Sequence, residues 1–189
     1  AALIAKVGWD LGWEAVAQLM DASLSADRVA RIRAIITGVD GVKDLHFLRT
    51  RQTGSQALVD VHVIVDPRIS VSEGHRIAQR IHDRVTDEFD EVADVLVHVD
   101  SEDDRGAAMG RGLPLREALE AQIRVAAAAA LGETPPLRAV TLHYLRDRVG
   151  VVLELPWQDG LDEPALARRL KAAVGALAHV GGVEVHFVA

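Results

Sequence analysis

Cysteine is absent from this chain of 189 residues, which excludes a disulfide framework and any metal site built on thiolates. Metal ligands must therefore be nitrogen or oxygen donors, and the absence of cysteine fits a reducing compartment. Aromatic residues make up only 4% of the chain while 49% is hydrophobic, so the core must be built mainly from Val, Leu, Ile and Ala. No apolar run reaches the roughly 18–20 residues that would span a bilayer alone.

Basic residues are also scarce, because 21 Lys and Arg stand against 28 Asp and Glu, for a net charge of -7. Proteins that bind nucleic acid usually present a basic surface, so we expect no nucleic-acid partner. An acidic surface attracts cations instead. Signatures of catalysis are missing too: there is no glycine-rich phosphate loop and no recognisable Ser-His-Asp motif. A zinc hydrolase would need a general base beside the metal, and Glu73, next to His75, is the only evident candidate. We therefore predict that the protein is not an enzyme.

Residues 1–24 are predicted to form a helical tail, because apolar residues recur at roughly helical spacing as far as Leu19. Trp9 and Trp13 are four residues apart and share one face of this helix. Paired tryptophans near a helix end are typical of a membrane–water interface, although the rings could equally pack the helix onto its own domain. The chain starts without Met and shows no signal-peptide cleavage site, so we expect a fragment or a processed chain.

Residues 25–104 show helix and strand patterns in the order α-β-β-α-β. Helices are expected after Ser25 and over residues 71–89, the second with an inward stripe of Val71, Ala78, Ile81 and Val85. Strands are expected over residues 42–50, 57–65 and 92–99. In the first strand, Leu45 and Phe47 should face inward, with His46 and Leu48 on the opposite face. This order predicts an α+β, ferredoxin-like αββαβ domain with a three-stranded sheet and its helices on one face.

A polar, glycine-containing stretch follows, and we predict a linker over residues 105–112. The same order of elements then repeats over residues 113–189. Two pairs of segments share letters: Asp44-Leu45-His46-Phe47-Leu48-Arg49 with Thr141-Leu142-His143-Tyr144-Leu145-Arg146, and Val97-His98-Val99 with Val185-His186-Phe187. We therefore predict a ferredoxin-like domain duplicated in tandem.

Four histidines and one aspartate of the first repeat are the candidate metal ligands: His46, His62, His75, His98 and Asp100. Three of these histidines fall on different predicted strands, on the face opposite the valine-rich one, and Asp100 points the same way as His98. Imidazole and carboxylate are usual ligands of Zn²⁺ and related divalent cations. Each histidine alone could simply face solvent, but three on one face of a sheet favour a metal site. Two further aspartates could orient the imidazoles, namely Asp60 and Asp66.

Four stretches of this repeat resemble the cytoplasmic domain of the cation diffusion facilitator family of divalent-metal transporters. They are Gly41-Val42-Lys43-Asp44-Leu45-His46-Phe47-Leu48-Arg49-Thr50-Arg51-Gln52-Thr53-Gly54, Val59-Asp60-Val61-His62-Val63, Gly74-His75-Arg76-Ile77-Ala78 and Val95-Leu96-Val97-His98-Val99-Asp100. Residues 8–21 also resemble the exit of that family's last membrane helix. The resemblance covers roughly residues 5–102, and all five candidate ligands fall where the family places them.

The resemblance implies a ferredoxin-like dimerisation domain on the cytoplasmic side of the inner membrane, with residues 1–24 as the end of the last membrane helix and its connector. It implies a homodimer with a zinc site near the interface of two domains, built from the five candidate ligands, with Asp100 as a bridging ligand. It also implies proton-driven export of Zn²⁺ or a similar ion such as Fe²⁺, Co²⁺, Ni²⁺, Mn²⁺ or Cd²⁺. The membrane unit is not in this chain, and the second repeat departs from the family, which typically stops near the equivalent of Asp100.

Residues 83–104 contain ten acidic residues and a single basic one, Arg84. A solvated helix end and loop would explain this composition. In a dimer, however, two such surfaces would repel, and divalent ions bound between them would neutralise the repulsion. We therefore hypothesise that metal binding closes two protomers and reports ion levels to the membrane unit.

Two questions stay open at this point. The second repeat retains His143 and His186 and has Glu154 in place of His62, but Val188 stands where the first repeat has Asp100. It therefore either holds a weaker metal site or is a copy that serves packing or oligomerisation. The alternative function is a soluble tandem ferredoxin-like module that senses a metal or a small ligand without a membrane partner. Apolar membrane-spanning segments upstream of Ala1 would favour the transporter over the soluble module.

Overall fold

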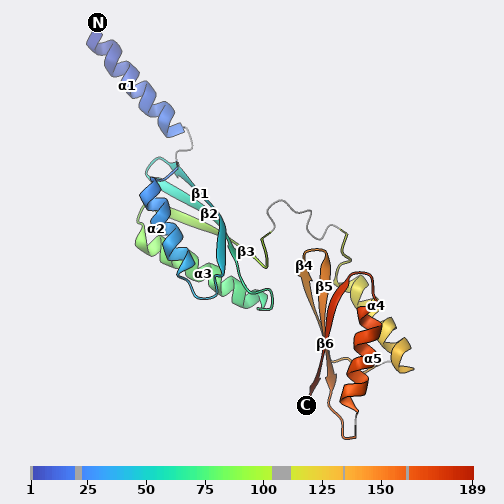
Figure 1. Cartoon of the computed structure of the whole chain (residues 1–189). Coiled ribbons are helices and arrows are strands. Elements are labelled where there is room, and N and C mark those ends of the chain that lie inside the picture. Colours follow the sequence, from blue (N-terminus) through green and yellow to red (C-terminus); the bar gives the residue numbers. More distant parts are fainter. Residues whose placement is uncertain (1, 20–22, 104–111, 134, 161) are drawn as a thin grey trace. The chain divides into compact units, whose positions relative to one another are not determined.

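The structure, a computed structural model, describes residues 2–19, 23–103, 112–133, 135–160 and 162–189. It divides the chain into two compact units, residues 1–103 and 104–189, which are taken one at a time below (Figure 1). The predicted linker at 105–112 lies almost wholly outside the described residues. The predicted domain boundaries therefore stay predictions.

The first helix, α1 (Ala2–Leu19), exposes those of its large apolar side chains that the structure describes, among them Leu3, Val7, Leu11 and Val16. The rings of Trp9 and Trp13 stack with centroids 6.5 Å apart and planes 11° from parallel, so they share one face as predicted. Both rings remain exposed, at 71% and 64%, and neither packs the helix onto its domain. None of the described helices is both long enough and apolar enough to cross a membrane.

The rest of the first unit follows the predicted order: α2 (Ala26–Thr37), β1 (Asp44–Thr53), β2 (Gln56–Ile64), α3 (Val71–Glu88) and β3 (Val92–Asp100). The strands form one sheet in the order β1-β2-β3. A short turn joins β1 to β2 as an antiparallel pair, whereas β2 and β3 are parallel and need the α3 crossover between them. Both α2 and α3 cover the same face of the sheet (Figure 1), which leaves the other face open.

The strict alternation of β2 decides which side chains face the helices. Its valines, Val59, Val61 and Val63, are at most 1% exposed and pack against buried isoleucines of the two helices, chiefly Ile32, Ile36 and Ile81. Because successive strand residues point to opposite faces, the polar residues between the valines lie on the open face. The core is therefore aliphatic, as the composition indicated, and His62 is directed away from it.

The predicted faces of β1 are right for Leu45 and His46 but wrong from Phe47 onward, because the strand contains a β-bulge. Leu45 pairs with Val63 and Phe47 pairs with His62, so His46 is an extra residue with no partner of its own in β2. An extra residue reverses the alternation that follows it. Leu48 consequently packs on the core, while Phe47, which was expected inside, is 38% exposed.

The predicted inward stripe of α3 is partly wrong as well. Gly74, Ile77, Ile81 and Val85 are the buried positions, whereas Val71 is 92% exposed. Val71 is the first residue of the helix, directly after Ser70, whose hydroxyl accepts a hydrogen bond from the Glu73 backbone N–H at 3.1 Å. Val71 lines a surface pocket together with Val97 and Val99 of β3 and is not covered by them.

The second unit repeats the architecture with α4 (Arg116–Leu131), β4 (Ala139–Leu145), β5 (Arg148–Pro156), α5 (Glu163–Gly175) and β6 (Val180–Val188). Its sheet has the order β4-β5-β6, with β4 antiparallel and β6 parallel to β5. Its core is again aliphatic and includes Leu119, Ile123, Leu153 and Leu170. The predicted α+β class and the tandem repetition of a ferredoxin-like αββαβ unit are confirmed.

The turn between α2 and β1 depends on Gly41. This residue has a φ of +93°, and a Cβ added to it would lie 2.6 Å from Cδ1 of Ile77. The turn therefore sits directly on α3, and a side chain at this point would push the helix away. Gly54, in the hairpin between β1 and β2, also has a positive φ of +64° but has open space around it.

We predict that Gly41→Ala destabilises the protein by about 2–5 kcal/mol, the sum of left-handed backbone strain and overpacking against Ile77. Gly54→Ala is the matched control, since it carries only the backbone strain of about 1–2 kcal/mol. Urea denaturation followed by circular dichroism measures both changes. Equal losses in the two variants would contradict the close packing of the turn on α3.

Candidate metal centre

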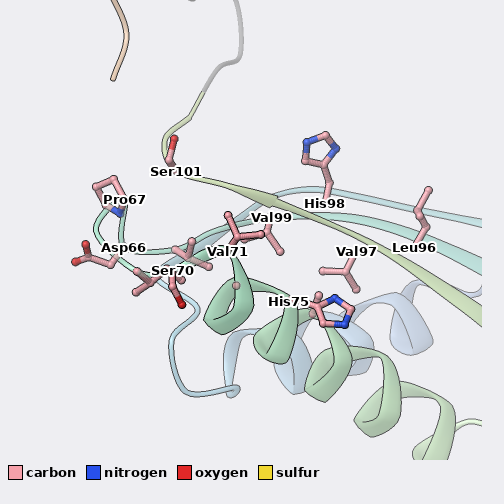
Figure 2. A pocket seen from close by; sticks show the side chains of 14 residues that line it. Asp66, Pro67, Ser70, Val71, His75, Leu96, Val97, His98, Val99 and Ser101 are labelled. Carbon is pink, nitrogen blue, oxygen red and sulfur yellow. The ribbon is translucent and has the colours of Figure 1, made fainter. Parts of the chain in front are cut away.

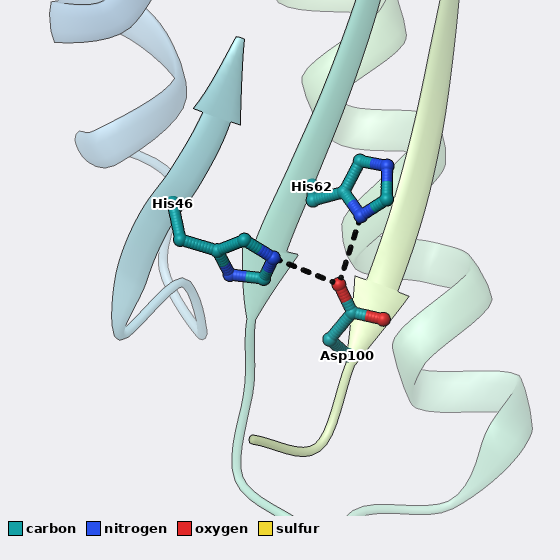
Figure 3. Close-up of side chains that lie close together, drawn as sticks. All are labelled: His46, His62 and Asp100. Atoms are coloured by element: carbon teal, nitrogen blue, oxygen red, sulfur yellow. Dashed lines mark hydrogen bonds and ion pairs between the residues drawn. The ribbon is translucent and has the colours of Figure 1, made fainter. Parts of the chain in front are cut away.

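Three imidazoles meet one carboxylate on the open face of the first sheet. Asp100 is the last residue of β3, and its Oδ2 lies 3.3 Å from Nε2 of His46 and 3.2 Å from Nδ1 of His62. Figure 3 shows both rings pointing at this oxygen from β1 and β2. The other oxygen, Oδ1, lies 3.1 Å from Nε2 of His98. Both oxygens of the carboxylate are therefore engaged.

Strand register brings these residues together. In the parallel pair of β2 and β3, His62 is level with His98, and Ile64 is level with Asp100. The rings of His62 and His98 stack with centroids 4.5 Å apart. Asp100 follows His98 by two residues and lies on the same face, so its carboxylate is beside the rings of both His62 and His98. The sequence spacing of these three residues therefore predicts their convergence correctly.

The β-bulge supplies the third imidazole. In a regular strand either His46 or Phe47, but not both, would face outward; the extra residue lets both do so. The ring of Phe47 touches that of His62 edge-on, with centroids 5.0 Å apart, and the ring centroid of His46 lies 5.5 Å from that of His62. The His46 side chain is only 1% exposed, whereas that of His98 is 62% exposed. The cluster thus has a buried end and an open end.

The donor atoms are spaced as ligands of one small ion would be. One donor atom each from His46, His62 and Asp100 lies within 4.8 Å of the other two, and among the described residues this is the single group of three or more. Ligands at about 2.0–2.1 Å from a tetrahedral Zn²⁺ lie about 3.3–3.4 Å from one another. The distances of 3.2 and 3.3 Å to the Asp100 oxygen are close to that value. Nitrogen and oxygen donors with this spacing fit a divalent cation.

His75, the fifth predicted ligand, is not brought into this cluster. It lies on α3, in the layer that covers the inner face of the sheet, and Figure 2 shows it on the opposite side of β3 from His98. Both histidines border a pocket of about 570 Å³ whose lining is otherwise mainly apolar. Within one chain, therefore, the structure groups His46, His62, His98 and Asp100 and leaves His75 apart.

The two aspartates proposed to orient the imidazoles have other partners. Asp60 binds Nε and one terminal nitrogen of Arg49, at 3.1 and 2.6 Å. Asp66 accepts a hydrogen bond from Nζ of Lys43 at 2.7 Å, and this bond lowers the pKa of its carboxyl below the usual value. The residue that does contact an imidazole of the cluster, Phe47, was missed because the sequence placed it inside.

The second unit retains only part of this arrangement. In its parallel pair, Glu154 is level with His186, which matches His62 and His98, and Pro156 is level with Val188, which matches Ile64 and Asp100. The first strand differs more, because β4 pairs with β5 in unbroken register and has no bulge. His143 is level with Gly150, near the hairpin, whereas Ala139 is the residue level with Glu154. The letter match between His46 and His143 is therefore out of register.

The first unit is similar to known proteins. The family described as "Cation efflux protein, cytoplasmic domain" matches residues 24–102. "Metal tolerance protein C1" of Arabidopsis thaliana is 36% identical over 98 residues, which are 52% of this chain and 21% of that protein. "Manganese efflux system protein MneP" of Bacillus subtilis is 32% identical over 99 residues, and "Cation-efflux pump FieF" of Shewanella oneidensis is 34% identical over 100 residues, each match covering 33% of the relative.

Among solved structures, a MamM CTD variant in its manganese form is 25% identical, with a TM-score of 0.39, over 40% of this chain and 96% of that one. The chain spans a third or less of the curated relatives named above. The second unit lies outside the stretch that the family matches. Residues 24–102 are therefore similar to the cytoplasmic domain of the cation efflux, or cation diffusion facilitator, family, a non-enzymatic class.

Proposed function

We propose that the first unit is the metal-binding dimerisation domain of a divalent-cation efflux protein, held on the cytoplasmic side of the cell membrane. The proposal depends on one observation: a single carboxylate, that of Asp100, is contacted by three imidazoles from three strands. The match of residues 24–102 to the cation efflux family supports it. The names of relatives speak of manganese efflux, cation efflux and metal tolerance, and export of an ion by the whole protein is the corresponding proposal here.

Zn²⁺ is the ion that we propose first. Neutral imidazole and carboxylate suit Zn²⁺, and they also accept Fe²⁺, Co²⁺, Ni²⁺, Mn²⁺ and Cd²⁺, among which intrinsic affinity follows a general order rather than biological choice. His46 and His62 converge on Oδ2 of Asp100, while His98 approaches Oδ1 from the open end. In this proposal Asp100 would bridge two ions, one at the buried end of the cluster and one at the open end.

A second copy of the chain is the partner that we propose for the pocket beside β3. Val71 and Leu96 line this pocket and are 92% and 67% exposed, so covering them would remove apolar surface from water. His75 borders the same pocket and lies on the opposite side of β3 from the cluster of its own chain. In a dimer closed over the pocket, His75 of a second copy could complete the open end of the cluster.

Acidic residues explain why closure would need the ion. The stretch 83–104 carries ten acidic residues, and two copies brought together over β3 would repel one another. A divalent ion neutralises part of this charge and adds directional bonds. Its contribution to closure is limited to the difference between its affinities for the closed and open states. Ion level would thereby set the population of the closed dimer, which the attached membrane unit would sense.

A soluble tandem sensor is the second candidate, and one observation favours it. The unit over residues 112–189 lies outside the family match, so the chain contains a second folded unit in addition to the domain that the family describes. In this version both units act without a membrane partner. The gene sequence that precedes Ala1 distinguishes the two, since a transporter requires several apolar spans upstream.

Replacing the shared carboxylate is the direct test of the site. We expect Asp100→Asn to weaken Zn²⁺ binding by more than about 100-fold, because loss of a ligand should exceed the 10–100-fold cost of losing an outer hydrogen-bond partner. Asp94→Asn, an exposed position on the same strand, is the matched control and should leave affinity unchanged. Isothermal titration measures both. Absence of Zn²⁺ binding in the unaltered chain, or equal affinity in both variants, would contradict the proposal.

The second unit is predicted to add no site of its own. Val188 offers no ligand and β4 lacks the bulge, so Glu154→Ala combined with His186→Ala should leave the number of bound Zn²⁺ ions unchanged. The paired substitution His62→Ala with His98→Ala should abolish tight binding in the same full-length chain. Metal content after equilibrium dialysis gives the count. A reduced count in the first variant would assign a working site to the second unit.

Dimer closure is tested separately from metal binding. Sedimentation equilibrium of the full chain should show that Zn²⁺ increases the dimer fraction. We expect Val71→Asp to suppress this increase at protein concentrations where the monomer still binds Zn²⁺, because it places a charge on the apolar pocket wall. Ala172→Asp, which adds the same single negative charge at an exposed position of α5 in the second unit, is the control. A Zn²⁺-driven dimer that is equally stable in both variants would exclude the pocket as the interface.

A further inference from the structure

A group of arginines on α3 has no role in the metal centre. Arg76, Arg80 and Arg84 are spaced four residues apart and therefore lie on one face of the helix. They line a cavity of about 210 Å³, together with Val39, Asp40 and Ile77. In a chain whose net charge is -7, this cavity gathers three arginines and one aspartate. It belongs to the helix layer, on the opposite face of the sheet from the histidine cluster.

The arginines are not balanced by carboxylates, unlike others in this unit. Arg28 pairs with Glu91, Arg31 with Glu88, and Arg49 with Asp60. In contrast, Arg84 donates to the backbone carbonyl of Gly38 at 3.0 Å, and Arg76 reaches only the side-chain amide oxygen of Gln79 at 3.5 Å. Within the described part of the chain, no ion pair joins any of the three cavity arginines to a carboxylate.

Like charges four residues apart on a helix repel one another and destabilise it. The duplicated helix shows that the fold does not require them. The core positions Ile77, Ile81 and Val85 of α3 correspond to Leu166, Leu170 and Val174 of α5, which have the same spacing and the same place before the last strand. The residue before each of these is Ala165, Arg169 or Ala173, so only the middle arginine is repeated in α5. Arg169 donates to the carbonyl of Ala130.

One wall of the cavity holds the last of the three arginines in place. Arg84 is fixed at one end by the Gly38 carbonyl, in the turn that closes against Ile77 at Gly41. Val39 and Ile77 are buried, at 4% and 8% exposure, and form an apolar floor. Asp40 is exposed at the rim. A guanidinium group presents paired N–H donors whose geometry matches the oxygens of a phosphate group.

We propose that this cavity binds a phosphate group, held between the guanidinium groups of Arg76, Arg80 and Arg84. Asp40 at the rim is an acceptor for a hydroxyl, which favours a phosphate ester that carries a hydroxyl over a bare polyanion. Two sources offer this chemistry: the headgroup of an anionic phospholipid and a dissolved phosphate compound. The site is independent of the metal cluster and uses none of its residues.

The test uses the full chain with EDTA present, so that no metal contributes. Inorganic phosphate and pyrophosphate are titrated at constant ionic strength while the ¹H–¹⁵N signals of the backbone and of the arginine Nε–H groups are followed. Sedimentation with phosphatidylglycerol vesicles, against phosphatidylcholine vesicles, tests the lipid source. We expect saturable binding in at least one arm, with Arg80→Gln weakening it by about tenfold or more, the loss that a charged hydrogen bond represents.

Arg168→Gln is the matched control, since it removes one exposed arginine from the duplicated helix without touching the cavity. It should leave binding unchanged, and Arg80→Lys should restore part of what Arg80→Gln loses. Thermal unfolding of Arg80→Gln should show no loss of stability, because the substitution relieves repulsion. Binding to vesicles alone identifies a lipid headgroup, and binding to pyrophosphate alone identifies a dissolved ligand. Absence of binding in every arm, or equal weakening by Arg80→Gln and Arg168→Gln, would overturn the proposal.

Discussion

One extra residue in β1 decides the chemistry of the open sheet face. Without the bulge at His46, the alternation that buries Leu45 would place Phe47 in the core and Leu48 outside. With it, Leu45 and Leu48 both pack inward, and His46 and Phe47 share the outer face beside His62. Bulges commonly re-aim a side chain next to a functional site. Here the bulge satisfies the aliphatic core and the imidazole cluster at once.

The duplicated unit separates the needs of the fold from those of the site. It keeps the αββαβ order, the sheet topology and an aliphatic core, but its first strand is regular and Val188 occupies the place of Asp100. The bulge and the carboxylate are therefore not required to build this sheet. A buried imidazole and a nearly buried carboxylate are costly to remove from water, and a bound cation would offset that cost.

Much of the first unit could be predicted because β2 alternates strictly. The run from Val59 to Val63 fixes the inner face, so His62 must face outward, and the two-residue spacing of His98 and Asp100 aligns both beside it. The element order and the αββαβ fold followed from the same periodicity. The partners of Asp60 and Asp66 were not predictable in this way, since long arginine and lysine side chains reach them from other strands and turns.

The bulge and the register of the second unit escaped prediction for a different reason. Leu45-His46-Phe47-Leu48 is compatible with either phase of alternation, but packing against the helices turns both Leu45 and Leu48 inward, which requires the phase to change between them. His143 was matched to His46 by neighbouring letters, but register is set by the hairpin, which places it level with Gly150. Local similarity between repeats cannot detect such a shift, because moving a strand leaves its letters unchanged.

Helix α3 connects the two surfaces that carry the proposals. Its buried stripe from Gly74 to Val85 holds it on the sheet, His75 faces the pocket beside β3, and Arg76 begins the row that lines the cavity near Asp40.

The proposed cation site lies on the far side of the sheet from this helix, so a bound cation and a bound phosphate group would have no direct contact. A ligand at one site can change affinity at the other only by favouring a different position of α3, and any such effect must be equal in both directions. Because Gly41 packs directly on Ile77, the turn before β1 restrains that movement. Coupling between the two sites therefore requires closure over the pocket to displace α3 against this turn.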